Sequence, residues 1–321
     1  MPAPRTLFVK LSSLGDVIHH LPAVSDLHAH RPDLQIGWVV EEAYAGLVKL
    51  HPAVSEVIPI GVRRLRRNPL SPRAWRDART ALRSVSRGHW DYVVDTQGLL
   101  KSAFVARRAH APVFGLDRKT AREGIVARFY DVKFHVPRNL HAVERNRRVV
   151  AQVFGYRFDA QPSYGLSTPP SPPAWVPERQ YVVLLHAASR AAKRWPGERW
   201  IALGGLLAGA GYASILPGGT PAEREAARSL AARIPGAIAA PAMALEEAAA
   251  LLAHASHVVG VDTGLTHLAV ALGRPTVGIY CATRAELTGL SGANGVNLGA
   301  PGKMPSVDAV AAALGYVPPQ A

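Results

Sequence analysis

The chain has 321 residues, a length that predicts about two domains. Its composition, 48% hydrophobic and 19% charged, is that of a globular protein and excludes a disordered one. The single cysteine, Cys281, excludes an intrachain disulfide and a cysteine-rich zinc site, and it fits a reducing compartment. No apolar run approaches the roughly 18 residues of a membrane-spanning helix, and the N-terminus lacks a signal-peptide pattern. We therefore expect a cytoplasmic protein.

The formal net charge of +14 is unevenly distributed. Residues 61–150 hold 21 basic and 7 acidic side chains, whereas residues 1–60 sum to −2 and residues 151–321 to +2. The densest part contains Arg63, Arg64, Arg66, Arg67, Arg73, Arg76, Arg79 and Arg83. One interpretation is a solvated basic face. The other is a binding site for a polyanion, because arginine matches phosphate and carboxylate groups bidentately.

The chemistry of such a polyanion is not given by charge alone. The basic stretch has no recognition-helix or RNA-binding signature and few interleaved aromatic residues, which argues against nucleic acid. A phosphorylated lipid or saccharide at an anionic membrane surface fits the same arginines.

The predicted elements alternate between short apolar strands and helices. In the first half, we expect strands at Arg5–Lys10, Gln35–Val40, Val57–Ile60 and Tyr92–Asp95, and helices at Asp16–His30, Pro72–Ser86 and Leu99–Ala109. Six prolines between Gly155 and Glu178 then predict a linker. In the second half, we expect strands at Tyr181–Leu185, Ala213–Leu216, His257–Val261 and Thr276–Tyr280, and helices at Gly197–Ala208, Pro221–Ile234, Leu245–Ala253 and Leu265–Leu272.

This alternation is typical of parallel sheets covered by helices on both faces. We predict an α/β domain over residues 1–158, a proline-rich linker over 159–178 and a second α/β domain over 179–305. A C-terminal helix within 306–321 would pack back on the first domain. Ligands of such sheets bind beyond the carboxyl ends of the strands, so two domains of this kind imply a cleft between them.

A polar turn follows the first predicted strand and ends at Asp16. The chain contains neither a GxGxxG nor a GxxxxGK[ST] motif, so this turn is not a standard nucleotide-binding loop. Asp16 has two equally weighted interpretations: an N-cap of a helix that begins at Val17, or a general base at the tip of the strand.

Two segments of the second half could bind phosphate. Lys193 lies in the basic turn after the strand Tyr181–Leu185 and could either neutralise a departing diphosphate or be an exposed loop lysine. Asp262-Thr263-Gly264-Leu265-Thr266-His267 follows a buried strand and opens a helix, whose N-terminus favours anions. Asp262 and Thr263 could cap that helix, Gly264 would let a ligand approach the backbone, and His267 would contact the same ligand. Together these residues favour phosphate binding.

The sequence predicts no resident metal. The histidines lack an HExxH constellation, and the chain contains no Asp-x-Asp, the usual means of holding a nucleotide sugar through a divalent cation. It also contains no GxSxG nucleophile elbow.

Several motifs, in this order, resemble those of the lipopolysaccharide heptosyltransferases, most closely the type I enzymes of the inner core. They are VKLSSLGD at the start, then WVVEE, DTQGLLKSA, KTARE, HAASRAAKRW and DTGLTHLAVALGRPT. The resemblance implies a GT-B fold, with two Rossmann-like domains whose parallel sheets face a central cleft. It also implies transfer of L-glycero-D-manno-heptose from ADP-heptose to a Kdo sugar of Kdo-lipid A, with inversion and without a metal or other cofactor.

The same resemblance assigns roles to residues. It makes Asp16 the base and Lys193 the residue that stabilises the leaving group, and it implies donor contacts from Ser189, Lys193, Glu223, Asp262, Thr263, Gly264, Leu265 and His267. Ala188 and the Tyr280-Cys281-Ala282-Thr283 segment depart from the family pattern, which leaves the role of that loop open.

The basic first half would then bind the acceptor, because Kdo carries carboxylates and lipid A carries phosphates. The expected acceptor residues are Ser13, Gly15, Arg63, Arg64, Arg66, Arg67, Lys101 and Arg122. The expected partners are the donor, the acceptor and the anionic inner face of the cytoplasmic membrane, to which the protein would be peripheral, with no nucleic acid. The alternatives are a heptosyltransferase for another core position and a non-catalytic ADP-heptose sensor.

Overall fold

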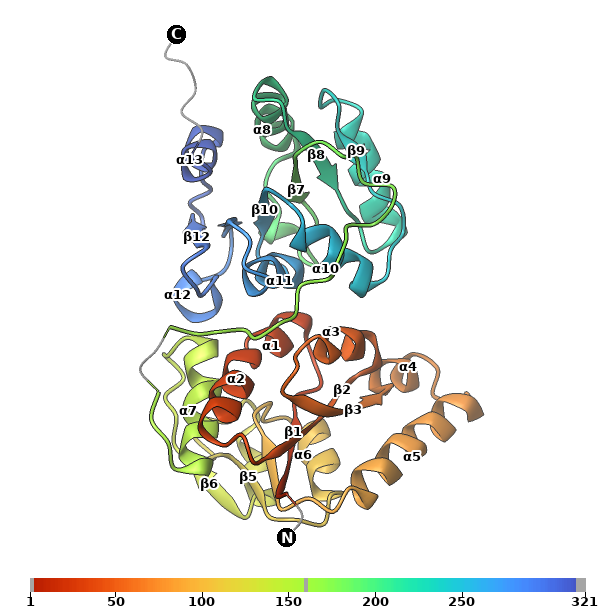
Figure 1. The fold of residues 1–321 in the computed structure, drawn as a ribbon, viewed down its shortest axis with the longest axis vertical. Coiled ribbons are helices and arrows are strands. Elements are labelled where there is room, and N and C mark those ends of the chain that lie inside the picture. The colour runs from red at the N-terminus through yellow and green to blue at the C-terminus, as the bar shows by residue number, and fades with distance from the viewer. Residues whose placement is uncertain (1–2, 159–160, 316–321) are drawn as a thin grey trace. The chain divides into compact units, whose positions relative to one another are not determined.

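The computed structural model describes residues 3–158 and 161–315 and divides into two compact units. Unit 1 comprises residues 1–167 and unit 2 residues 168–321 (Figure 1). Each unit has its own sheet and its own core, as the two predicted domains require.

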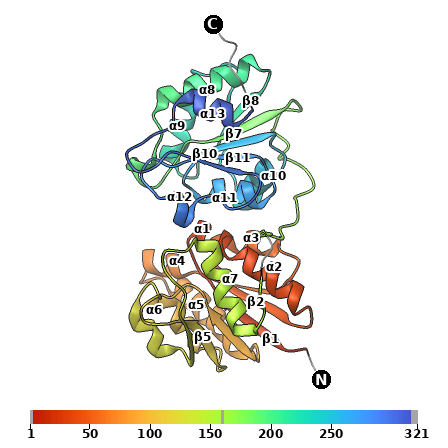
Figure 2. The ribbon, with the colours of Figure 1, turned by 90° about the vertical axis from the view of Figure 1, so that its left-hand side faces the viewer.

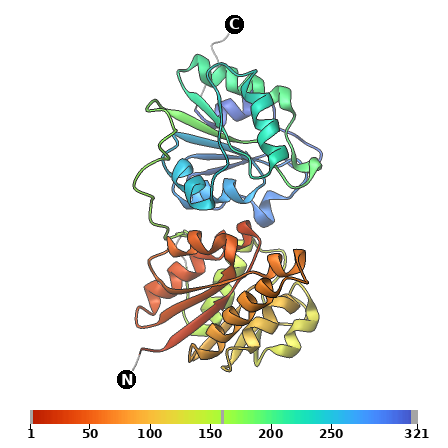
Figure 3. The ribbon, with the colours of Figure 1, turned by 90° about the vertical axis from the view of Figure 1, so that its right-hand side faces the viewer.

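Unit 1 is built on a parallel sheet of six strands in the order β3-β2-β1-β4-β5-β6. Its central strands are buried because helices cover both faces of the sheet. Figures 2 and 3, which view the molecule from opposite sides, show α2 and α7 over one face and α5 over the other. The elements are β1 (Arg5–Val9), α1 (Leu14–Ile18), α2 (Leu21–His30), β2 (Gln35–Glu41), η1 (Glu42–Tyr44), α3 (Ala45–Lys49), β3 (Val54–Ile60), α4 (Val62–Arg67), α5 (Pro72–Arg87), β4 (Tyr92–Asp95), α6 (Leu100–Arg107), β5 (Val113–Leu116), η2 (Gly124–Phe129), β6 (Val132–Phe134) and α7 (Ala142–Phe154).

Unit 2 repeats this design with a parallel sheet in the order β12-β11-β10-β7-β8-β9. Helix α8 packs on α9 and α13, and α10 packs on α11. Its core includes Trp195, Trp200 and the single cysteine, Cys281. The elements are β7 (Tyr181–Leu185), η3 (Ala191–Lys193), α8 (Gly197–Gly209), β8 (Ala213–Leu216), α9 (Pro221–Ala231), β9 (Ile238–Ala239), α10 (Leu245–Ala253), β10 (His257–Val261), α11 (Gly264–Ala271), β11 (Thr276–Ile279), α12 (Ala285–Thr288), β12 (Gly295–Leu298) and α13 (Val307–Ala313).

Both sheets have the strand order of a dinucleotide-binding Rossmann fold. Counted within each unit, the order is 3-2-1-4-5-6 in both cases. The order reverses between β1 and β4 in unit 1, and between β7 and β10 in unit 2. Ligands of such sheets bind at this switch point, beyond the carboxyl ends of the two strands. The loops after β1, β4, β7 and β10 are therefore the places to look for a site.

One predicted helix differs from the observed elements. The helix expected over Asp16–His30 is two helices, α1 and α2, interrupted at His19 and His20, with Pro22 in the first turn of α2. The predicted C-terminal helix is present as α13, and it packs on α8. The reason is apolar burial: Val310, Ala311 and Leu314 belong to the core of unit 2.

The proline-rich segment contains no helix or strand over residues 161–180. Its first part belongs to unit 1, where Tyr164 is buried and the Ser167 N–H donates to the Leu50 carbonyl at 2.9 Å. Its second part belongs to unit 2, where His254 Nε2 lies 2.9 Å from the Pro169 carbonyl. The boundary between the units thus falls inside the predicted linker. Among the helices of residues 3–158 and 161–315, none is long and apolar enough to cross a bilayer.

Candidate functional site

Asp16 lies just after β1, at the switch point of unit 1. It is the third residue of α1 and not the cap of a helix that begins at Val17, because Ser13 is the N-cap. The Ser13 backbone N–H and hydroxyl both donate to Asp16 Oδ2, at 2.9 and 3.0 Å. Arg122 Nη2 donates to the other oxygen, Oδ1, at 2.8 Å. The carboxylate therefore braces the first turn of α1 and also pairs with an arginine.

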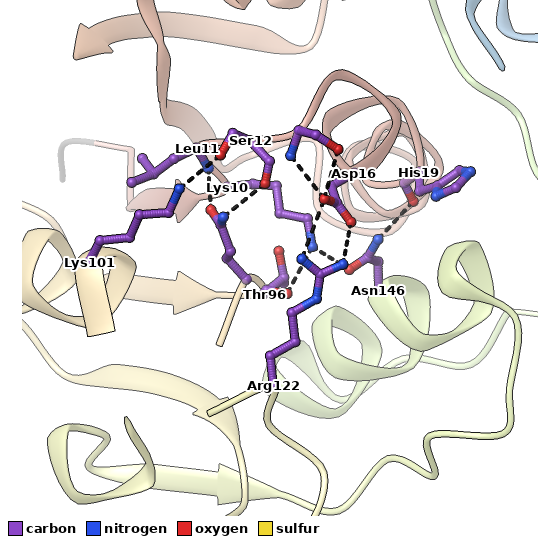
Figure 4. A network of polar contacts seen from close by, with 11 residues as sticks. Lys10, Leu11, Ser12, Asp16, His19, Thr96, Lys101, Arg122 and Asn146 are labelled. Atoms are coloured by element: carbon purple, nitrogen blue, oxygen red, sulfur yellow. Dashed lines mark hydrogen bonds and ion pairs between the residues drawn. The ribbon is translucent and has the colours of Figure 1, made fainter. Parts of the chain in front are cut away.

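A pocket opens beside this carboxylate. Among the described residues, three cationic side chains line this pocket: Lys10, Arg122 and Arg145. Asp16 supplies the one carboxylate in the lining that the structure describes. Lys10 is buried and donates from Nζ to the Thr96 carbonyl at 2.8 Å and to Asn146 Oδ1 at 3.1 Å (Figure 4). The excess of positive charge suits an anionic ligand next to Asp16.

The charges in this pocket shift one another's proton affinities. Burial alone would raise the pKa of Asp16, but Lys10, Arg122 and the two bonds from Ser13 hold it below the usual value. Burial lowers the pKa of Lys10 to about 8, with Asp16 opposing the change. Asp16 is consequently ionised at neutral pH and able to accept a proton.

Side chains from the loop after β4 and from α6 hold the connection between β1 and α1 in place. Gln97 accepts from the Leu11 N–H at 2.6 Å and donates to the Ser12 carbonyl at 2.8 Å. Lys101 donates from Nζ to the Ser12 hydroxyl at 2.9 Å, a contact visible in Figure 4. Burial lowers the pKa of Lys101, while the carboxylate of Glu41 opposes that shift.

Four of the five arginines expected to bind the acceptor lie on one short helix, α4, but differ in their contacts. Arg64 pairs with Glu42 and with Asp77, each at 2.9 Å. Arg63 lies over the ring of Tyr44, 5.2 Å from its centroid. Arg66 and Arg67 are exposed and make no ion pair with any described residue. Of the four, only Arg66 and Arg67 thus have guanidinium groups with neither an ion pair nor an aromatic contact among the described residues.

The second cluster lies at the switch point of unit 2. Lys193 Nζ is 2.7 Å from Asp262 Oδ2, which also accepts from the Thr283 hydroxyl at 2.7 Å. His267 Nε2 is 3.4 Å from Asp262 Oδ1. Burial would raise the pKa of Asp262, but the hydrogen bonds from His267, Lys193 and Thr283 hold it far below the usual value. The loops after β7, β10 and β11 are therefore joined through one carboxylate.

Helix α11 begins within this cluster. Thr263 is its N-cap but makes no side-chain capping bond, and Gly264 and Leu265 form its first turn. Asp262 does not cap the helix, because its oxygens are taken by the three partners above. The first N–H groups of a helix have no acceptor within it, so they can bind a ligand's phosphate oxygens.

Ser189 and Glu223, which were also expected to bind the donor, make no contact with Asp262 among the described interactions. Ser189 is exposed in the loop after β7. Glu223 is the third residue of α9, and its Oε2 accepts from the N–H groups of Gly219 and Thr220, at 3.0 and 2.9 Å. Glu223 thus closes a capping box, and no hydrogen bond from a described residue occupies its other carboxylate oxygen.

Sequence reasoning missed several contributors. Lys10, Asn146 and Arg145 gave no signal of their own, because nothing in the sequence places α7 beside β1. Thr283 lies in the segment that departs from the family pattern. Glu41, buried at the end of β2, accepts from the Arg63 N–H at 2.8 Å and fixes the start of α4. The WVVEE motif contained it, but its role depends on the path of the chain after β3.

No three His, Cys, Asp or Glu side chains gather as metal ligands in the part of the chain that the structure describes. The charges available for an anionic ligand are those of lysine, arginine and helix N-termini.

Comparisons with known proteins agree with this geometry. A family model described as glycosyltransferase family 9 (heptosyltransferase) matches residues 78–316. Lipopolysaccharide heptosyltransferase 1 of Pseudomonas aeruginosa is 42% identical over 300 residues, covering 92% of this chain and 83% of that protein.

Two solved structures of the Escherichia coli heptosyltransferase WaaC are similar over nearly the whole chain. The one with ADP has a TM-score of 0.86 and 38% identity, covering 95% of this chain and 96% of the other. The one with ADP-2-deoxy-2-fluoro heptose has a TM-score of 0.82 and 39% identity, with the same coverage.

Proposed function

This chain belongs to glycosyltransferase family 9, the heptosyltransferases, and from that premise we propose how it performs heptose transfer in the lipopolysaccharide core. The donor is ADP-L-glycero-D-manno-heptose and the acceptor is a Kdo residue of Kdo-lipid A. The observation that carries the proposal is the ionised carboxylate of Asp16 at the unit 1 switch point, beside a pocket lined by three cations.

The donor binds to unit 2 at the Lys193–Asp262 cluster. Lys193 and the first N–H groups of α11 hold the diphosphate, and Asp262, Thr263 and His267 contact the donor around it. Glu223, with one carboxylate oxygen outside the capping box, binds the ribose of the nucleotide, and Ser189 adds a hydroxyl. The solved WaaC structure with ADP-2-deoxy-2-fluoro heptose, at 39% identity, supports ADP-heptose as the donor.

The reaction is a single in-line displacement. The acceptor oxygen attacks the anomeric carbon while its proton passes to the carboxylate of Asp16. The bond between that carbon and the β-phosphate oxygen breaks, and ADP leaves with the electron pair. Lys193 and the α11 N-terminus stabilise the charge that develops on ADP. One displacement at one carbon inverts its configuration.

Arg122 links acceptor binding to the base. It pairs with Asp16 at 2.8 Å, yet about half of its side chain is exposed. An acceptor carboxylate that bound Arg122 would compete with Asp16 for the guanidinium. Because Arg122 is one of the cations that lower the pKa of Asp16, this exchange would raise the proton affinity of the base when the acceptor arrives.

The acceptor also defines where the protein works. Arg66 and Arg67 are cations without an ion pair among the described residues and would bind lipid A phosphates. Arg63 and Lys101 would add positive charge, and Ser13 and Gly15, at the start of α1, would contact the acceptor beside Asp16. A lipid acceptor places the reaction at the cytoplasmic face of the inner membrane, with the protein bound peripherally. Lys193 takes the part that a divalent cation has in other transferases, so we propose that no metal is needed.

The test is incubation with ADP-heptose and a Kdo-bearing lipid A, followed by mass spectrometry of the product. The wild type should add one heptose, and an EDTA arm should give the same rate. Asp16→Asn keeps an acceptor for the Ser13 N–H but removes the base, and it should lower turnover by about 10²- to 10⁴-fold. Its affinity for ADP should stay within about twofold.

The matched control is Asp33→Asn, the same change at an exposed carboxylate of unit 1. It should leave turnover unchanged. Near-normal turnover by Asp16→Asn would remove Asp16 from the role of base, and loss of activity with EDTA would overturn the metal-independent step.

A further inference from the structure

The outer face of α5 is a row of arginines. Arg73, Arg76, Arg79, Arg83 and Arg87 follow one another at intervals of three or four residues, the spacing of one helical face, and all five are exposed. The opposite face is buried through Ala74, Ala78, Ala81 and Val85, and α5 packs against β3. Figures 1 and 3 both show α5 along the outside of unit 1. The solvent-exposed face of α5 is therefore positively charged. We call these five residues the arginine row.

No acidic side chain neutralises this row within the described residues. The chain from Val62 to Gly88 contains nine arginines and one acid, Asp77. Asp77 is paired with Arg64 of α4 at 2.9 Å. The row makes no ion pair with any described residue, so its positive charge is exposed to solvent.

An apolar tip adjoins the N-terminal end of the row. Leu70, in the connection between α4 and α5, is 94% exposed, the largest exposed fraction among the exposed large hydrophobic residues described. Trp75 is 46% exposed, and its Nε1–H donates to the Pro69 carbonyl at 2.7 Å, which holds the ring beside the same connection. An exposed leucine and an exposed tryptophan at one connection indicate an interaction surface.

We propose that the arginine row and the Leu70–Trp75 tip dock the protein on an anionic phospholipid bilayer. The row spans about 21 Å at 1.5 Å per residue, enough to contact several headgroups. Arginines near an anionic surface are attracted to it, and tryptophan and leucine are favoured in the interfacial region. The inference rests on the proposed function, which supplies a lipid-borne acceptor, and it assigns the docking to residues outside the acceptor site.

The apolar tip decides between lipid and nucleic acid. Duplex phosphates would match the arginines equally well, but they offer nothing apolar to Leu70. A bilayer interface satisfies both features at once. Because the apolar face of α5 is already packed on β3, only the tip enters the bilayer, and the row stays at headgroup level.

The test measures binding of the full chain to sedimented vesicles. Vesicles of mixed phosphatidylglycerol and phosphatidylcholine should bind the protein, and pure phosphatidylcholine should not. The triple variant Arg76→Gln, Arg79→Gln and Arg83→Gln should weaken partitioning on the order of 100-fold, from about fivefold per charge. Leu70→Ser should weaken it by several-fold without changing its dependence on salt.

Matched controls lie in unit 2. Arg228→Gln, Arg233→Gln and Arg284→Gln remove the same charge from exposed positions, and Leu206→Ser makes the same apolar change on α8, where Leu206 is 40% exposed. These variants should bind vesicles like the wild type. All variants should turn over a deacylated, water-soluble acceptor at the wild-type rate.

Each other outcome is decisive. Equal losses in the α5 and unit 2 triple variants, or wild-type binding by the α5 variant, would overturn the docking surface. Tighter binding to duplex DNA than to anionic vesicles, unaffected by Leu70→Ser, would assign the row to nucleic acid instead. Turnover of the soluble acceptor without vesicle binding overturns only this inference, whereas vesicle binding without turnover overturns only the proposed function.

Discussion

Lys10 and Asp16 are two opposite charges at the end of one strand. Lys10 is buried and bonded to Thr96 and Asn146, so its ammonium cannot turn to solvent. The positive charge of Lys10 helps to keep Asp16 ionised. Burial of Lys10 removes water from its ammonium group and lowers the pKa of Lys10 to about 8. A residue that no sequence motif singled out thereby sets the protonation state of the proposed base.

This arrangement predicts how stability depends on pH. Lys10 loses its proton at about 8 in the folded chain but near its ordinary value of 10.5 in the unfolded chain. Between these values the unfolded state binds more protons, so the contribution of Lys10 to stability rises with pH. A gap of this size corresponds to about 3 kcal/mol.

Chemical denaturation of the wild type and of Lys10→Met, at pH 7.5 and at pH 10, measures this contribution. As the pH rises, the difference in the free energy of unfolding between the wild type and Lys10→Met should shift in favour of the wild type. Lys49→Met removes an exposed lysine of unit 1 and should give a difference that does not change with pH. Parallel pH curves for the wild type and Lys10→Met would contradict the prediction.

At the scale of elements, the Lys193–Asp262 cluster, the proposed donor site, includes a contact from the loop after β11. Thr283 donates to Asp262 at 2.7 Å from a segment that departs from the family pattern. A hydrogen bond to a charged group contributes about 1.5–3 kcal/mol. Thr283→Val keeps the shape and removes the donor, so the KM for ADP-heptose should rise about tenfold while the KM for the acceptor stays the same.

Initial-rate measurements with each substrate varied in turn test this expectation. Thr288→Val makes the same change at an exposed position of α12 and should leave both constants unchanged. If both KM values rose together in Thr283→Val, the loop would serve overall folding rather than the donor.

The elements show how far the sequence alone could go. Continuous apolar runs predicted the central strands, such as Tyr181–Leu185 and His257–Val261, at their observed bounds. The edge strand β6 was missed because its three residues, Val132–Phe134, are mostly exposed and lack an apolar pattern. The break between α1 and α2 was missed because the residues that interrupt the helix, His19 and His20, are compatible with helix, and the helical pattern runs through them.

For the candidate site as well, the sequence predicted local features but not long-range contacts. Local chemistry identified Asp16, Lys193 and Asp262, because each follows a buried strand and carries a charge. Contacts between distant segments could not be predicted: Arg122 reaches Asp16 across 106 positions, and Asn146 reaches Lys10 across 136. Such pairs depend on strand order, which single-sequence patterns do not encode.

At the scale of the molecule, two separate sheets with two cores predict two unfolding transitions. If ADP binds only to unit 2, it should stabilise one of them. At a concentration 100 times the dissociation constant, the gain is about 2.7 kcal/mol. For a domain of this size, the corresponding shift in melting temperature is about 5–10 °C.

Calorimetry with and without ADP makes the measurement, and Val310→Ala assigns the transitions. Val310 is fully buried in the core of unit 2, so its truncation should lower the same transition that ADP raises, by about 2 kcal/mol. Val296→Ala, at a valine that is 42% exposed, should lower neither. A shift of both transitions by ADP would contradict a donor site confined to unit 2.

Cys281 lies among the side chains that α13 and Trp195 help to enclose, and burial raises the pKa of its thiol. A sulfur that is both shielded and protonated reacts slowly with alkylating reagents. As the chain has no other sulfhydryl, every alkylated molecule records one opening event of that core. The rate of alkylation, followed by mass spectrometry, therefore measures how often the core of unit 2 opens, without any engineered label.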